Sequence, residues 1–162
     1  MMNHIEIFTI GVYGSTEEVF FKKLLDNKID TFCDIRQRRA VRGSAYAFVN
    51  SQRLQTHLKE LGINYFHIKE LAPPIEIRRQ QQLADKQNNQ KKRTRTELGS
   101  LFVKSYNDLC LSNFDSKAFV QTLTPKAHRI VLFCVEQSPL ACHRHLVALK
   151  LKNELDLKVI DL

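Results

Sequence analysis

The sequence lacks any long hydrophobic run, which excludes a protein with a membrane-spanning helix. No window approaches the roughly 20 apolar residues that such a helix needs, and segment 1–10 lacks a charged stretch followed by an apolar one. The four cysteines, Cys33, Cys110, Cys134 and Cys142, do not have the spacing of a zinc finger. We therefore expect a cytoplasmic protein with reduced thiols and no membrane contact.

Acidic residues are also scarce relative to basic ones. The chain has 17 Asp and Glu against 25 Lys and Arg, a formal net charge of +8. This balance favours a polyanionic partner, although a generic basic surface is the alternative. With 162 residues, 43% hydrophobic and 26% charged, the composition is that of one globular domain spanning residues 1–162 rather than of a disordered or fibrous protein.

Strand and helix patterns alternate along the chain. Apolar and β-branched runs predict strands at 5–10, 31–35, 63–68, 129–135 and 158–161. Between them, periodic apolar positions predict helices at 15–27, 51–61, 94–109, 116–123 and 138–154. The pattern predicts an α/β fold: a largely parallel, doubly wound (Rossmann-like) sheet of about five strands with helices on both faces.

Three of these helix starts rest on specific capping signals. Ser15 with Glu18, and Thr94 with Glu97, form capping boxes, and Ser138-Pro139 is a cap and first-turn pair. Segment 76–95 has few apolar residues, so we expect an exposed helix or a mobile basic arm.

Ligands of open α/β sheets bind beyond the carboxyl ends of the strands, so residues that follow each strand are candidates. The first strand is followed by a glycine turn, Gly11-Val12-Tyr13-Gly14-Ser15, that enters a helix. Free N–H groups there favour a phosphate, but the full dinucleotide or Walker spacing is absent and a purely structural tight turn is the alternative. The candidate ligand-binding residues of this turn are Gly11, Tyr13, Gly14 and Ser15.

The second strand ends at Asp34 and runs into a loop with four arginines within seven residues. Guanidinium groups suit bidentate phosphate recognition, and nearby rings could stack on a base; a solvated charged loop is the alternative. Asp34 is either a carboxylate paired with arginine or a catalytic group. The candidate binding residues of this segment are Arg36, Arg38, Arg39, Arg42, Ser44, Tyr46 and Phe48.

The strand at 129–135 leads to Glu136 and then to a helix that opens near Cys142. Glu136 is a candidate general acid or base if it faces Asp34, or else an ion-pair partner of Arg144. Cys142, at a helix start near His143 and Arg144, is a candidate nucleophile, although buried free cysteine is commoner. A zinc site from Cys134, Cys142, His143 and His145 matches no standard ligand spacing, so we expect no metal and no cofactor.

These segments together resemble the DUF488 family of small prokaryotic α/β proteins over nearly the whole chain. The matching segments are Thr9-Ile10-Gly11, Asp34-Ile35-Arg36, Arg42-Gly43-Ser44 with Tyr46-Ala47-Phe48, Leu61-Gly62-Ile63-Asn64-Tyr65, and Phe133-Cys134-Val135-Glu136 with Cys142-His143-Arg144. The arginine-rich loop and Leu71-Ala72-Pro73-Pro74 depart from the usual pattern, so the chain resembles a basic branch. The resemblance implies a fold and a candidate site, but no reaction.

The hypothesis favoured by the residues is an enzyme that acts on nucleic acid, with DNA favoured over RNA. Between Arg78 and Arg95 seven basic residues stand against one acidic residue, so the arm could hold several phosphates. A crevice with Asp34 and Glu136 suits a glycosylase that hydrolyses the N-glycosidic bond of a modified base, with phage defence as one setting. The alternatives are a Cys142-dependent enzyme on a small phosphate- or sulfur-containing substrate, and a non-catalytic binding module.

Overall fold

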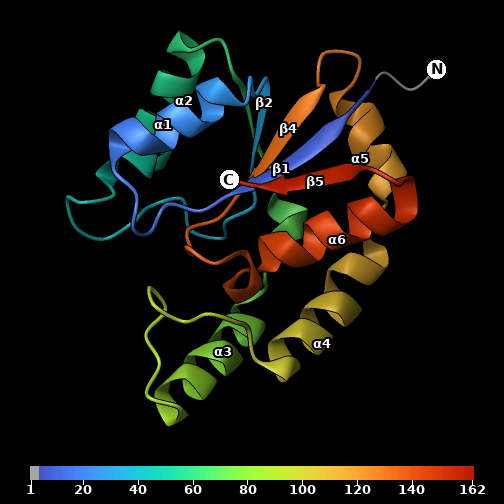
Figure 1. Ribbon diagram of the computed structural model, residues 1–162. Helices are drawn as coiled ribbons and strands as arrows, with labels where there is room; N and C mark the ends of the chain where they lie inside the picture. The colour runs from blue at the N-terminus through green and yellow to red at the C-terminus, as the bar shows by residue number, and fades with distance from the viewer. Residues whose placement is uncertain (1–3) are drawn as a thin grey trace.

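The computed structural model describes residues 4–162, which form a five-stranded sheet flanked by helices (Figure 1). The strands are β1 (Glu6–Ile10), β2 (Thr31–Asp34), β3 (Asn64–His67), β4 (Arg129–Phe133) and β5 (Lys158–Asp161). Every neighbouring pair is parallel. The expected α/β class and parallel sheet are confirmed. Along the described chain, no helix is both long and apolar enough to cross a bilayer.

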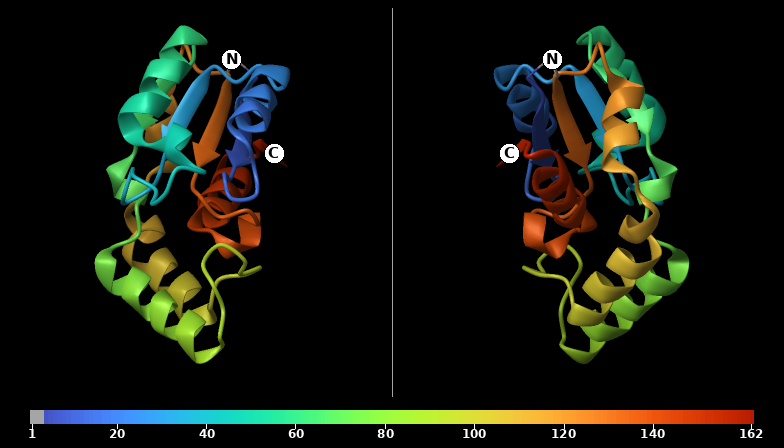
Figure 2. Two further views of the ribbon diagram at one scale, coloured as in Figure 1. Left: turned by 90° about the vertical axis from the view of Figure 1, so that its left-hand side faces the viewer. Right: turned by 90° about the vertical axis from the view of Figure 1, so that its right-hand side faces the viewer.

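The strand order β3-β2-β4-β1-β5 creates a switch point at β4. The chain leaves β1 and β2 through α1 (Glu17–Asp26) and α2 (Ser51–Glu60), which lie on one face of the sheet (Figure 2). It leaves β4 through α6 (His143–Leu155), which lies with α5 (Ser116–Leu123) on the opposite face. Because loops diverge there, the carboxyl end of β4 is where an open α/β sheet forms a crevice.

The three central strands, β1, β2 and β4, are almost completely buried and carry most of the core of the sheet. Both faces of β1 and β2 are buried, as is β4 from Ile130 onward, since helices cover the sheet on both sides. On one face, Phe20 of α1 packs on Phe133 of β4 with ring centroids 5.5 Å apart, and Phe32 of β2 completes the group. The edge strand β3 alternates exposed and half-buried positions.

Two helix starts differ from the expected caps. Helix α1 is capped by Thr16, whose hydroxyl accepts from Val19 N at 3.2 Å, because the preceding Ser15 N–H closes a turn onto Val12 O. Helix α4 (Ser100–Leu109) begins after Gly99 rather than at Thr94. The Gly99 N–H bonds to Gln81 Oε1 at 2.9 Å, so a neighbouring helix sets this start and the local capping pattern does not.

The start of α6 also lies later than expected. Ser138 precedes a short 3₁₀ helix, Pro139–Ala141, and Cys142 then occupies the N-cap position of α6. His143 is therefore the first helical residue, and both groups sit directly beside the end of β4.

Helices α3 (Ile75–Gln87) and α4 form a lobe beyond the carboxyl edge of the sheet (Figure 1). Segment 76–95, expected as an exposed helix or mobile arm, is a helix that packs Ile77, Gln81 and Asp85 inward and continues into a loop. We call residues 88–99 the return loop, because it runs back to the sheet edge, where Leu98 N bonds to Leu140 O. The sequence pattern missed this packing because the inward face is mostly polar.

The loops after β1 and β4 are in direct backbone contact. A Cβ built on Gly11 would lie 2.0 Å from Glu136 O, and the N–H groups of Val12 and Tyr13 both donate to Val135 O. Arg144 donates to the same Glu136 O from α6 at 2.6 Å. Only glycine at position 11 permits this approach. The contact holds the backbone of Glu136 against the loop that follows β1, at the carboxyl edge of the sheet.

We expect Gly11→Ala to lower the free energy of unfolding by about 1–3 kcal/mol or more, since the opposing backbone oxygen has no room to move. Urea unfolding followed by circular dichroism measures this change. Gly99→Ala is the matched control: its Cβ would meet only a side-chain oxygen of Gln81, at 3.3 Å, and no backbone atom, so its loss should be clearly smaller. Equal losses in the two variants would contradict the proposed role of this contact.

Candidate functional site

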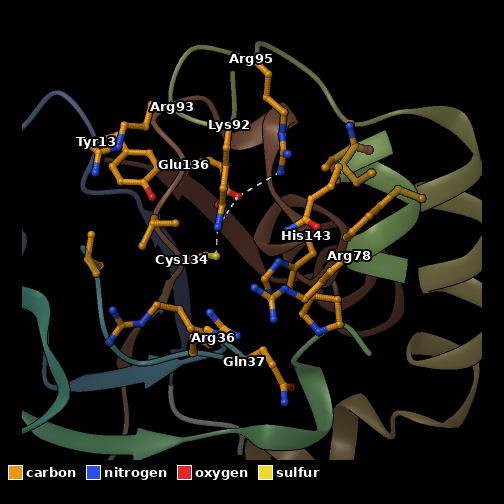
Figure 3. Close-up of a pocket in the computed structure, with 18 of the residues that line it drawn as sticks. Tyr13, Arg36, Gln37, Arg78, Lys92, Arg93, Arg95, Cys134, Glu136 and His143 are labelled. Carbon is orange, nitrogen blue, oxygen red and sulfur yellow. Dashed lines mark hydrogen bonds and ion pairs between the residues drawn. The ribbon is translucent and has the colours of Figure 1, made fainter. Parts of the chain in front are cut away.

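A cavity of about 420 Å³ opens at the carboxyl end of β4, between the sheet edge and the α3–α4 lobe (Figure 3). Its walls come from five segments: the loop after β1, the arginine-rich loop after β2, helix α3 with the return loop, helix α4 through Phe102, and the residues that follow β4. Its volume lies in the range of roughly 300–1,000 Å³ that small-molecule sites occupy. The crevice expected from the strand order is thus a real cavity.

Seven Lys and Arg residues line this cavity, against one carboxylate, Glu136. Three of the seven cations are near acids: Arg36 pairs with Asp34, Arg95 with Asp85 and Glu136, and Lys92 Nζ lies 3.9 Å from Glu136 Oε1. The other four have no carboxylate within ion-pair distance in residues 4–162. They are Arg38, Arg42, Arg78 and Arg93. The cavity therefore carries a strong positive potential that favours an anionic ligand.

Glu136 is held at the floor of the cavity by contacts on two sides. Arg95 Nη2 donates to Glu136 Oε1 at 3.0 Å, and the Cys134 thiol donates to Glu136 Oε2 at 3.2 Å (Figure 3). Its side chain is only 5% exposed. Burial, followed by the neighbouring Cys134, raises the pKa of Glu136 above its ordinary value, and the nearby cations oppose this rise. A buried carboxylate of this kind can orient water or exchange a proton.

Tyr13 and Arg93 form an aromatic wall at one side of the cavity, and Tyr46, which does not line the cavity, packs against Tyr13. The rings of Tyr13 and Tyr46 have centroids 5.2 Å apart, and the Arg93 guanidinium lies over both, at 5.1 and 5.3 Å. Tyr46 is held because its hydroxyl accepts from Gly14 N at 2.8 Å. Such a surface can stack on a planar base while the guanidinium binds a phosphate.

His143 and Cys134 line the cavity together, with Cys142 directly behind them. His143 Nε2 lies 2.9 Å from Ile35 O, and a carbonyl only accepts, so Nε2 carries a hydrogen. Burial acts to lower the pKa of His143, but Cys134 and Glu136 outweigh it and raise that pKa. A hydrogen bond with Cys142, together with burial, raises the pKa of Cys134 to about 12.

Asp34 adopts the paired arrangement that was one of its two expected roles. It is fully buried and does not line the cavity. Arg36 Nε and Nη2 donate to its two oxygens at 2.9 and 2.8 Å, and Tyr65 adds a third side-chain hydrogen bond at 2.7 Å. The carboxylate has no free face for a substrate, so it does not form a catalytic pair with Glu136.

The glycine turn after β1 does not offer the phosphate cradle that we expected. The N–H groups of Val12 and Tyr13 donate to Val135 O, that of Gly14 donates to Tyr46, and that of Ser15 donates to Val12 O. Glu17 and Glu18 also occupy the first turn of α1, where their charges oppose an anion. The structural role of Gly11 and Gly14 explains this turn, and of the group only Tyr13 lines the cavity.

Several further candidates lie outside the cavity. Phe48 is buried in the core against Phe20 and Phe21, Arg39 is directed to Tyr65, and Ser44 does not reach the site. Arg144 is 1% exposed and binds the backbone oxygens of Glu136 and Gln137, so it supports the loop. Cys142 is equally buried, whereas the neighbouring thiol of Cys134 is the one that reaches the cavity.

The α3–α4 lobe supplies four cations that were expected as part of the basic arm 76–95, and two glutamines that were not expected. Arg78 and the return-loop residues Lys92, Arg93 and Arg95 line the cavity, together with Gln81 and Gln82 of α3. The excess of basic residues between 78 and 95 was the available signal. The fold of the lobe, which no local pattern indicates, decides which of them point inward.

The fold and cavity define a parallel α/β protein with a strongly basic site at the switch point of its sheet. A family model described as a domain of unknown function, DUF488, matches residues 15–151. The chain therefore belongs to the DUF488 family, which confirms the resemblance of its motifs. Searches of curated proteins and of solved structures gave no match.

We expect Asp34→Asn to lower the free energy of unfolding by about 3–5 kcal/mol, because it leaves the buried Arg36 charge without its partner. Thermal and urea unfolding measure the loss. Asp26→Asn is the control: Asp26 pairs with Lys22 on the surface, where the two side chains are 59% and 66% exposed, and the change should be at most ~1 kcal/mol. If Asp34→Asn unfolds no more easily than this control, the structural role of Asp34 is wrong.

Proposed function

We propose that this DUF488 protein is a hydrolytic enzyme that acts on nucleic acid, with DNA the expected partner, and that the cavity at the end of β4 holds the target nucleotide. The observation that carries the proposal is the set of four cavity arginines, Arg38, Arg42, Arg78 and Arg93, which have no acidic partner within the described part of the chain. These guanidinium groups come from three separate segments, so they can bind successive phosphates of a nucleic-acid chain. A pocket for a single phosphate would not need cations from so many segments.

The aromatic wall favours a nucleotide as the ligand, rather than a simple phosphate ester that has no base. Tyr13 is buried on one side and faces the cavity on the other, and Arg93 covers its ring at 5.1 Å. A base displaced from its stack could lie along this wall while its flanking phosphates meet the arginines.

We propose N-glycosidic hydrolysis of a modified base as the reaction, with Glu136 as its single carboxylate. Glu136 would accept a proton from a water molecule whose oxygen bonds to the anomeric carbon of the sugar. The bond from that carbon to the base breaks, and the base leaves with the proton that Glu136 took from the water, so the carboxylate is regenerated. Asp34 takes no part, because Arg36 and Tyr65 occupy it.

A mechanism with Cys142 as the nucleophile is supported less well than the mechanism with Glu136. Cys142 is 1% exposed and lies behind the cavity wall. A cysteine mechanism would have to use Cys134, whose thiol donates to Glu136 and whose pKa is raised to about 12, the opposite of an activated nucleophile.

The proposed setting is the cytoplasm, with defence against phage DNA that carries modified bases as one role. All four cysteines are unpaired and buried, which suits a reducing compartment.

Nucleic-acid binding should depend strongly on salt and on the unpaired arginines. We expect Arg78→Gln and Arg38→Gln each to weaken binding of a labelled single-stranded DNA and to reduce the slope of log K against log salt by roughly 0.7. Fluorescence anisotropy at several salt concentrations measures both quantities. Lys104→Gln, at a site 79% exposed on α4, is the control that should leave them unchanged. Identical slopes in all three variants would show that the cavity is not the binding site.

Catalysis should depend on Glu136. We expect Glu136→Gln to lower the rate of base release by roughly 10²–10⁴-fold while DNA affinity stays within a few-fold, because the cations are retained. Abasic sites are detected by alkaline cleavage of DNAs that carry damaged or naturally modified bases. Glu97→Gln, an exposed change in the return loop, should keep full activity. Wild-type protein that leaves no abasic site in any of these DNAs would contradict the reaction.

A further inference from the structure

Three potential metal ligands converge at the floor of the cavity, although the sequence spacing gave no reason to expect a metal. They are Cys134, which follows β4, Cys142 at the N-cap of α6, and His143, the first residue of that helix. One ligand atom from each lies within 4.8 Å of the others, and all three residues are buried. His145, the fourth candidate considered from the sequence, is not in this group.

We propose that Cys134 Sγ, Cys142 Sγ and His143 Nδ1 bind one transition-metal ion of the zinc type. Ligands bonded at ~2.3 Å in a tetrahedron lie about 3.8 Å apart. Cys142 Sγ and His143 Nδ1 are already 3.7 Å apart, so small side-chain rotations close the set.

The environment of His143 is that of a metal ligand. Its Nε2–H donates to Ile35 O at 2.9 Å, which fixes the ring and leaves the Nδ1 lone pair directed toward the sulfurs. Metal-binding histidines almost always have their second nitrogen bonded in this way, often to a backbone carbonyl. Two thiols with an imidazole also form a ligand set that selects zinc over Mg²⁺ or Ca²⁺.

The charge balance of the site is simple. Each thiol gives up its proton on binding, so a divalent ion and two thiolates form a neutral centre with the neutral imidazole, and two protons are released. The amino end of α6 favours the sulfur charges, because helix N-termini stabilise anions.

The position of the ligands leaves one coordination site open toward the cavity. Cys134 and His143 line the cavity whereas Cys142 lies behind them. Three protein ligands with an open fourth position are the arrangement of catalytic rather than structural zinc sites. Glu136 lies beside that position, with Oε2 3.2 Å from Cys134 Sγ. This inference rests on the cluster itself and does not depend on the proposed nucleic-acid substrate.

Cobalt titration of the purified protein, without nucleic acid, tests the site. We expect one Co²⁺ per chain with an intense near-ultraviolet sulfur-to-cobalt absorption, displaced by one equivalent of Zn²⁺. Cys142→Ser should weaken Zn²⁺ binding by roughly 100-fold or more, measured by competition with a chelator. Cys110→Ser changes a cysteine directly after α4 that is also buried but outside the cluster, and this variant should bind the metal as the wild type does. Absence of the sulfur band, or equal weakening in both variants, would overturn the proposal.

X-ray absorption of the wild-type protein loaded with Zn²⁺ keeps the test valid even if Cys142→Ser does not fold. We expect two sulfur neighbours at ~2.3 Å and at least one imidazole nitrogen at ~2.0–2.1 Å. A shell of oxygen and nitrogen without sulfur would overturn the site. Because neither experiment contains DNA, a negative result leaves the proposed base release untouched, and a failure of base release leaves the metal site untouched.

Discussion

The close approach of two loops at one edge of the sheet is the constraint on which the site depends. Parallel strands β1 and β4 end at the same level, Ile10 beside Phe133, and the chain then leaves them toward opposite faces. Gly11 lets the backbone oxygen of Glu136 come within a distance that no Cβ permits, and Arg144 holds the same oxygen from below. The Glu136 side chain lies at the cavity, where Arg95 and the Cys134 thiol bind its two oxygens.

Charge in the site is divided between structure and binding. Arg36, Arg95 and Arg144 are buried or nearly so and are bound to carboxylates or backbone oxygens, so they hold the walls in place. The cations available to a ligand come instead from the arginine-rich loop, α3 and the return loop. Because buried charges must be paired whereas cavity charges need not be, burial separates the two groups more reliably than residue type does. The same edge also gathers the two thiols and the imidazole around Glu136, so anion binding and a metal centre would share one cavity.

Much of the fold could be predicted from the sequence, because strand and helix periods alternate clearly and strand ends in a parallel sheet meet at one edge. Glu136, Tyr13, Arg38 and Arg42 were found by that reasoning and line the cavity. The sequence could not show that Asp34, Arg144 and Phe48 have structural rather than catalytic or binding roles, because their pairing and burial depend on residues that are distant in sequence. The basic arm 76–95 was expected to hold phosphates, but its packing as part of a lobe was missed for the same reason. The contacts of Gln81 with Asp85 and Gly99 that shape the lobe are polar and leave no hydrophobic period. The cluster of Cys134, Cys142 and His143 has no standard spacing and becomes visible only when β4 and α6 are side by side.

The central claim is that one cavity at the end of β4 holds a phosphate-bearing nucleic-acid chain. A crystal structure of the protein with a short single-stranded DNA tests it most directly. We expect a phosphate oxygen within ~3.2 Å of guanidinium nitrogens from at least two of Arg38, Arg42, Arg78 and Arg93, with a sugar ring next to Glu136. DNA bound on another face, with no nucleotide in the cavity, would contradict it.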